Sequence, residues 1–241
     1  MISKPNKKYK AVLFDLDGTL LNIDIEKFIQ AYIHKLAGRF DQYLDKDEFI
    51  QHLFGATAQM VENVDSSKKN EVVFYEDFCF RTGLALKEIK PIIDDFYNND
   101  FPLLSCWGKE HPPANIVVEL AKDKELKLVL ATNPIFPTTA VLQRLSWSGI
   151  AVDNFDLITS MENMHFCKPN KEYYLEIASK IDCLPEDCLM AGNDTYEDLN
   201  AAKAGMETFL VEDFILKRGD EIPACNYRGK MDDLLKFIDS L

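Results

Sequence analysis

Short apolar runs alternate with longer amphipathic segments over much of this chain, and this alternation limits the possible folds more than any other feature. The runs contain many β-branched or aromatic residues, as buried strands do. We predict strands at YKAVLFD (9–15), KLVLAT (127–132), FDLITS (155–160), CLMAG (188–192) and ETFLV (207–211). Helical periodicity predicts helices over 114–122, 138–146, 171–180 and 196–203. The predicted fold is therefore α/β, with a Rossmann-like parallel sheet core and helices on both faces.

Residues 25–99 break the alternation, because they show helical periodicity and no convincing strand. Four helices fit this stretch, at 25–40, 47–64, 71–83 and 87–99. The first carries an apolar stripe that consists of Phe28, Ile29, Tyr32, Ile33 and Leu36. Stripes of this kind pack together in helical bundles. We therefore predict an α-helical bundle over 24–100, inserted into an α/β core domain formed by 1–23 and 101–241.

Polar residues suited to catalysis follow four of the predicted strands. They are Asp15, Asp17, Gly18 and Thr19 after the first strand, Thr132 and Asn133 after the second, Lys168 beyond the third, and Asn193, Asp194 and Asp198 after the fourth. In an open parallel sheet, functional groups collect beyond the carboxyl ends of the strands. The predicted fold therefore brings these four groups to one place.

Carboxylates from several segments repel each other in one cleft unless a cation neutralises them. The oxygen-rich set around Asp15, Asp17 and Asp194 has no His or Cys nearby, which favours Mg²⁺ as the cofactor. Lys168 adds a positive charge, and the Thr132 hydroxyl adds a donor for phosphate oxygens. The sequence therefore predicts a phosphoryl-transfer site for a small phosphorylated substrate.

Four motifs in order along the chain resemble those of the haloacid dehalogenase (HAD) superfamily. They are FDLDGTLL, VLATN, KPNKEYY and AGNDTYEDLNAAKAG, and they extend from Phe14 to Gly205. The resemblance implies that Asp15 attacks phosphorus to form an aspartyl-phosphate. It also implies that Asp17 protonates the leaving oxygen and then activates water. The helical insertion resembles the cap of family members in which a cap lies between the first and second motifs.

The resemblance also gives roles to the remaining residues. It implies that Thr132, Asn133 and Lys168 bind phosphate, that Lys168 also holds the nucleophile, that Asp15, the carbonyl of Asp17 and Asp194 hold Mg²⁺, and that Asn193 and Asp198 stand beside these ligands. One position departs from the family pattern, because the fourth motif usually reads Gly-Asp and here Asn193 follows Gly192. Counting back from AKAG (202–205) favours Asp194 as the ligand.

Several of these residues also have simpler interpretations. Thr19 could satisfy the backbone of its own turn, and Asn133 could cap the helix that follows it. Asp198 could be an exposed acid on a helix, and Lys171 is a rival to Lys168. The sequence leaves these alternatives open.

The leading hypothesis is a Mg²⁺-dependent phosphatase whose helical cap closes over the site. A sugar-phosphate mutase would share this chemistry. A phosphonatase would need a cap lysine, for which Lys27, Lys35 and Lys46 are available. A dehalogenase is disfavoured because those relatives lack the second acid, here Asp17. The alternative from a different class is a non-catalytic binding module.

Composition restricts the partners and the cellular location. The net charge of −13 argues against an extended nucleic-acid surface. No apolar run approaches the roughly 18 residues of a membrane span, and no signal peptide is recognisable, so we expect a cytoplasmic protein. The six cysteines form no CxxC pair, which disfavours zinc and favours free thiols. The sequence does not indicate an oligomeric state.

Overall fold

The computed structural model describes residues 8–241, and its centre is a six-stranded parallel sheet. The strand order is β5–β4–β1–β6–β7–β8, with β1 at Ala11–Phe14, β4 at Lys127–Leu130, β5 at Leu157–Ile158, β6 at Cys188–Gly192, β7 at Glu207–Val211 and β8 at Tyr227–Gly229. Every pairing between neighbours in this sheet is parallel. The predicted α/β fold with a Rossmann-like sheet is confirmed. The edge strand β8 was not predicted, and the predicted strand at 155–160 is only two residues long.

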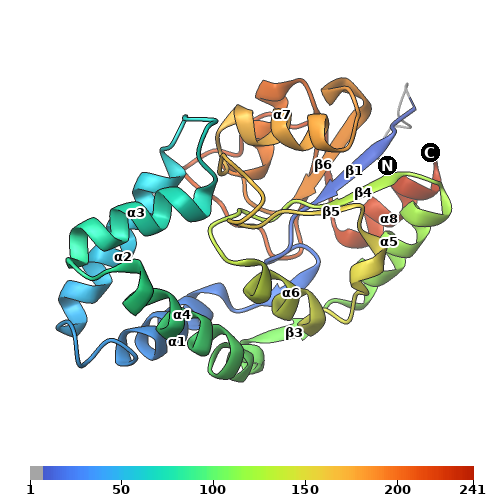
Figure 1. The fold of residues 1–241 in the computed structure, drawn as a ribbon. Coiled ribbons are helices and arrows are strands. Elements are labelled where there is room, and N and C mark those ends of the chain that lie inside the picture. Colours follow the sequence, from blue (N-terminus) through green and yellow to red (C-terminus); the bar gives the residue numbers. More distant parts are fainter. Residues whose placement is uncertain (1–7) are drawn as a thin grey trace.

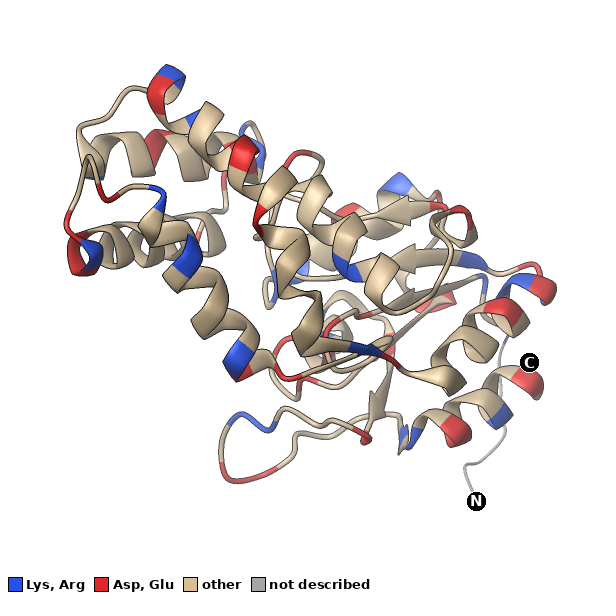
Figure 2. Cartoon of the chain, turned by 90° about the horizontal axis from the view of Figure 1, so that it is seen from below, with Lys and Arg blue, Asp and Glu red and all other residues tan. Residues whose placement is uncertain are grey.

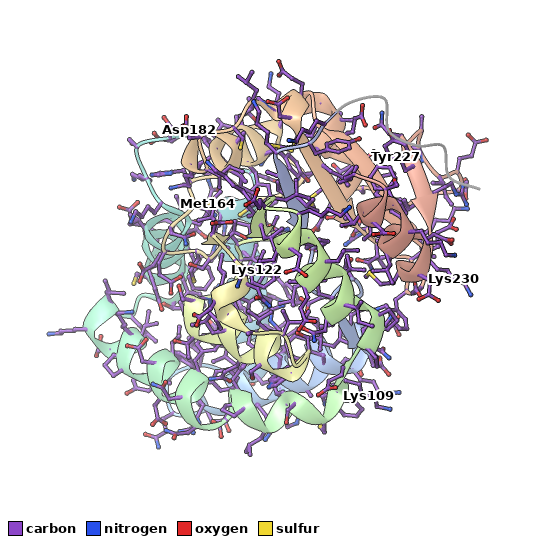
Figure 3. The ribbon with its side chains drawn as sticks, turned by 90° about the vertical axis from the view of Figure 1, so that its right-hand side faces the viewer. Lys109, Lys122, Met164, Asp182, Tyr227 and Lys230 are labelled. Atoms are coloured by element: carbon purple, nitrogen blue, oxygen red, sulfur yellow. The ribbon has the colours of Figure 1, made fainter. Side chains whose placement is uncertain are left out.

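Helices cover both faces of this sheet (Figure 1). They are α5 (Pro112–Asp123), α6 (Thr138–Trp147), α7 (Lys171–Lys180) and α8 (Met231–Asp239). Successive side chains of a strand point to opposite faces. Ala11 and Leu13 therefore pack in an apolar cluster with α7, whereas Val12 and Phe14 pack in the cluster that contains α5, α6 and α8. Figure 3 shows α5 beside α8, with Tyr227 and Lys230 at the junction of β8 and α8.

Four further helices form a separate lobe next to the sheet (Figure 1). They are α1 (Ile25–Gly38), α2 (Lys46–Val61), α3 (Asn70–Thr82) and α4 (Leu86–Asn99). Their buried faces are rich in aromatic rings, such as Phe40 and Phe49, whose centroids lie 4.7 Å apart. The lobe also contacts the core, because the backbone N–H of Asn70 donates to the Met164 carbonyl at 2.8 Å.

A small antiparallel hairpin connects the two parts of the chain. Its strands are β2 (Leu21–Ile23) and β3 (Gly108–Glu110), and a 3-10 helix at Phe101–Trp107 precedes β3. The sequence analysis did not predict these strands, because three residues are too few to show an alternating pattern. The predicted helix over 196–203 is also different in the structure, where a 3-10 helix covers Asp198–Ala204.

Charged side chains are distributed over both the helical lobe and the α/β core (Figure 2). Acidic and basic residues are interspersed along most of the visible helices. Within residues 8–241, no helix has the length and apolar character needed to cross a membrane.

Candidate active site

The predicted site residues meet at the carboxyl ends of the central strands. β1 lies between β4 and β6, and the Asp15 N–H donates to the Ala191 carbonyl at 2.9 Å where β1 ends. A cavity of about 240 Å³ opens at this edge. It is lined by Asp15, Asp17, Ile25, Ile29, Thr132, Asn133, Ile135, Phe136, Arg144, Asn193, Asp194, Glu197, Leu216 and Arg218. Residues from all the predicted groups except Lys168 and Asp198 therefore line one cavity.

Lys168 and Asp198 lie directly beneath this lining. The Lys168 side chain is fully buried, and its Nζ lies 2.8 Å from Asp15 Oδ1 and 2.6 Å from Asp198 Oδ1. The second oxygen of Asp198 accepts the backbone N–H of Asp194 at 2.8 Å. Asp198 is thus a buried acid that ties Lys168 to the Asp194 loop, and the interpretation of it as an exposed helical acid is wrong. Lys171, the rival to Lys168, is exposed.

Burial dominates the electrostatics of this group. It raises the pKa of Asp15 to about 6 and that of Asp198 to about 7, although the Lys168 ammonium opposes both shifts. Burial alone would lower the pKa of Lys168, but the two carboxylates raise it well above its ordinary value. One lysine therefore cannot fully neutralise two buried carboxylates.

Asp17 pairs with an arginine that the sequence analysis missed. Arg144 Nη1 donates to Asp17 Oδ2, and the Arg144 guanidinium lies 4.4 Å from the centroid of the Phe136 ring. Burial raises the pKa of Asp17, and Arg144 opposes this shift. Arg144 lies on α6 among the buried residues Ala140, Val141 and Leu145. A charged residue within the apolar stripe of the predicted helix was the sequence signal that could have revealed it.

Asp194 is held by its own loop and by a second arginine. Its Oδ1 accepts the N–H groups of Tyr196 and Glu197 at 2.7 and 2.9 Å. Its Oδ2 lies 2.9 Å from Nη2 of Arg218, which is about half exposed. Burial raises the pKa of Glu197 to about 7. The sequence analysis did not single out Glu197 or Arg218, because single charged residues in loops carry no recognisable pattern.

Asn193 is engaged in hydrogen bonds that shape the loop after β1. Its Oδ1 accepts the Thr19 hydroxyl at 3.1 Å, and its Nδ2 donates to the Phe214 carbonyl at 2.7 Å. Gly18 has φ +82°, and a Cβ at that position would lie 2.2 Å from Asn193 Nδ2. The turn therefore needs glycine both for its backbone conformation and for this close approach. Thr19 is buried and contacts Asn193, as a residue that stabilises the turn would.

Thr132 and Asn133 lie at the opposite wall of the cavity. The Thr132 carbonyl accepts the hydroxyls of Thr159 and Tyr173, at 2.7 and 2.8 Å. Asn133 Oδ1 accepts the Lys168 N–H at 3.2 Å, and its Nδ2 donates to Glu197 at 3.1 Å. Because α6 begins at Thr138 after the cap residue Pro137, Asn133 does not cap that helix. Its side chain instead joins three of the predicted groups.

The charges at the site do not balance. Five carboxylates (Asp15, Asp17, Asp194, Glu197 and Asp198) face three cations (Arg144, Lys168 and Arg218) in or beneath the cavity wall, an excess of two negative charges. A divalent cation would restore neutrality, and carboxylates are suitable ligands for a hard ion. Within residues 8–241, no three acidic, His or Cys side chains are placed to hold one ion. The predicted ligand set needs only two carboxylates, from Asp15 and Asp194, together with the Asp17 carbonyl.

Comparison with known proteins identifies the family. The family model of haloacid dehalogenase-like hydrolases matches residues 9–205. This chain belongs to that family. It is 23% identical over 238 residues to a protein named pyrophosphatase PpaX from Bacillus mycoides (strain KBAB4), and the match covers 97% of this chain and 99% of the relative. HAD-like hydrolases generally use a divalent metal.

Solved structures of the family share this fold at low sequence identity. A HAD phosphatase from Thermococcus onnurineus gives a TM-score of 0.61 at 20% identity, with 96% of this chain and 98% of that chain covered. An L-2-haloacid dehalogenase from Xanthobacter autotrophicus, with chloropropionic acid covalently bound, gives 0.58 at 14% identity, with 96% and 98% covered. Because phosphatases and dehalogenases share the fold, the residues of the site must decide between these activities.

Proposed function

We propose that this HAD-like hydrolase is a Mg²⁺-dependent phosphatase that acts on a small phosphorylated metabolite through an aspartyl-phosphate at Asp15. The observation that carries this proposal is the contact of Lys168 Nζ with Asp15 Oδ1 at 2.8 Å, in a cavity that Asp17 also lines. A buried ammonium fixes one oxygen of Asp15 and leaves the carboxylate oriented for attack.

The proposed reaction has two steps at phosphorus. Asp15 forms a bond to phosphorus as the bond to the leaving oxygen breaks, and Asp17 donates a proton to that oxygen. A water molecule then gives a proton to Asp17 and attacks phosphorus, which releases inorganic phosphate and restores Asp15. Thr132, Asn133 and Lys168 would bind the phosphoryl oxygens during both steps.

Magnesium is the proposed cofactor. Asp15, Asp194 and the Asp17 carbonyl would hold it, and Asn193 and Asp198 would orient these ligands through hydrogen bonds. The excess of two negative charges in and beneath the cavity wall supports a divalent ion at this place. When bound, the ion would neutralise charge on the transferring phosphoryl group.

Residues 24–100 are the proposed cap domain, with 1–23 and 101–241 as the core. Ile25 and Ile29 of α1 line the cavity, so the lobe already contributes part of its wall. Closure of this lobe over a bound substrate would exclude water from the aspartyl-phosphate.

The alternative activities receive less support. Among the described residues, those that line the cavity include no lysine, which disfavours a phosphonatase that needs a Schiff base from the cap. Asp17 lies in the site, as a phosphatase requires and a dehalogenase does not. A mutase would use the same residues, and product analysis with a hexose 1-phosphate seeded with its bisphosphate would identify one. The name of the Bacillus relative makes pyrophosphate a substrate to include.

The decisive experiment measures phosphate release from a panel of phosphate esters, with and without Mg²⁺. Asp15→Asn should abolish release, and acid-quenched wild-type protein should retain label from a radiolabelled substrate while the variant does not. Asp187→Asn is the matched control, because Asp187 also pairs with a lysine (2.6 Å to Lys10) but lies outside the cavity. Substantial turnover by Asp15→Asn would refute the role of Asp15. The cytoplasmic location stays a prediction.

A further inference from the structure

The ion pair between Arg144 and Asp17 uses only half of its hydrogen-bonding capacity. Arg144 Nη2 and Asp17 Oδ1 are both buried, and neither has a hydrogen-bond partner among the described residues. Arginine and carboxylate side chains commonly pair through two parallel bonds, which would satisfy both atoms. A buried polar atom without a partner is destabilising, and such atoms gather at functional sites.

Arg144 is fixed at this position by its surroundings. It is 1% exposed, its Nε donates to the Ala140 carbonyl at 3.4 Å, and its guanidinium packs on the Phe136 ring. The charge therefore cannot leave the cavity wall without breaking these contacts. A fixed cation with a free N–H group in a wall of a small cavity is suited to bind an anion.

The other residues around the cavity leave Arg144 as the group that can recognise the leaving part of a substrate. Asp15, Thr132, Asn133 and Asp194 surround the place proposed for the transferring phosphoryl group. The lining contributed by the helical lobe is apolar, from Ile25 and Ile29. Arg218 also lines the cavity, but it is about half exposed and paired with Asp194.

We propose that the leaving group of the substrate carries an anionic oxygen close to the scissile bond, and that Arg144 binds it. This inference rests on the proposed function, because Asp17 must contact the leaving oxygen to protonate it. Arg144 contacts Asp17 and therefore lies within reach of atoms one or two bonds from that oxygen. A carboxylate on the adjacent carbon and a second phosphoryl group have the required chemistry. The cavity of about 240 Å³ suits a substrate of this small size.

The test compares substrates that differ only in the leaving-group charge. Wild-type protein with Mg²⁺ is assayed on 2-phosphoglycolate and on its carboxamide, with pyrophosphate as the phosphoryl arm. We expect kcat/KM to favour the carboxylate over the amide by about 10- to 100-fold, the contribution of a charge-assisted hydrogen bond. Pyrophosphate should be turned over faster than phosphoglycolate if the natural anion is a phosphoryl group, and more slowly if it is a carboxylate.

Variants assign this preference to Arg144. In Arg144→Gln the ratio between carboxylate and amide should approach one, whereas Arg144→Lys should retain part of it. Arg81→Gln is the matched control, because Arg81 also pairs with an aspartate but lies outside the cavity, and its ratio should equal that of the wild type. Using the ratio removes any general loss of rate caused by disturbing Asp17. If Arg144→Gln does not fold, the wild-type ratio alone still decides.

Equal kcat/KM for the two compounds in the wild type, or a preference that survives in Arg144→Gln, would overturn the inference and leave the phosphatase intact. Calorimetric binding of both compounds to Asp15→Asn gives a readout without turnover. Tighter binding of the carboxylate would support the role of Arg144, and equal binding would refute it. Absence of phosphate release from every compound by the wild type would instead contradict the proposed function.

Discussion

Replacing Lys168 with methionine should destabilise the protein in a manner that depends on pH. Lys168 is fully buried between Asp15 and Asp198, so its loss leaves two buried carboxylates without their cation. Removing one partner of a buried ion pair lowers the free energy of unfolding by about 3–5 kcal/mol. A domain with a typical stability of about 5–15 kcal/mol would lose a large part of it.

The sign of the pH dependence follows from the carboxylates. The pKa of Lys168 is raised well above its ordinary value, so the lysine stays charged in the wild type between pH 5.5 and 8. The folded-state pKa values of Asp15 and Asp198 are already raised by burial to about 6 and 7, and loss of Lys168 removes the charge that opposes these shifts. The folded variant therefore binds more protons than the folded wild type, and its stability decreases more steeply as pH rises. We expect the full loss at pH 8 and a smaller one at pH 5.5.

Urea denaturation of the metal-free proteins at both pH values measures this difference. Lys171→Met is the matched control, because Lys171 is three residues away and exposed, and surface substitutions usually change stability by less than about 0.5 kcal/mol. A loss below about 1 kcal/mol at pH 8, or an equal loss at both pH values, would show that Lys168 does not neutralise Asp15 and Asp198.

Two further predictions concern the turn after β1 and the metal. Gly18→Ala should be more destabilising than Gly83→Ala by about 1–3 kcal/mol in urea denaturation, because both glycines have positive φ but only Gly18 would place a Cβ against Asn193; equal losses would contradict this packing argument. Because protons compete with the metal for Asp15, whose pKa is raised to about 6, Mg²⁺ should raise the melting temperature more at pH 8 than at pH 5.5, and a shift that is larger at pH 5.5 would count against the proposed ligand set.

The sequence was sufficient to predict the central sheet and the place of the site. The strands β1 and β6 are buried on both faces, so their residues form continuous apolar runs that are easy to recognise. The side chains that follow them, including Asp15 and Asp194, lie at the same edge because parallel strands end there together. This geometry depends on the strand pattern alone, and it needed no knowledge of side-chain contacts.

Short and irregular elements were beyond such a pattern. The strands β2, β3 and β8 have three residues each, which is too short for an alternation to be distinguished from chance. The burial of Asp198 was equally hidden, because a 3-10 helix replaced the predicted helix and changed which residues face the sheet. Local periodicity predicts a face only when the helix type is known.

The cationic partners of the acids were the least predictable part of the site, and the reason is geometric. Asp17 and Arg144 are 127 residues apart, and their contact depends on how α6 packs against the loop after β1. A sequence shows that several carboxylates converge and therefore need positive charge, but it does not show which basic residue supplies it. Arg144 could be distinguished from the other basic residues only by its place among the apolar residues of α6, where an unpaired charge would be strongly destabilising. A charged residue in the apolar stripe of a helix that follows a catalytic strand is therefore a useful sign of a partner across the site.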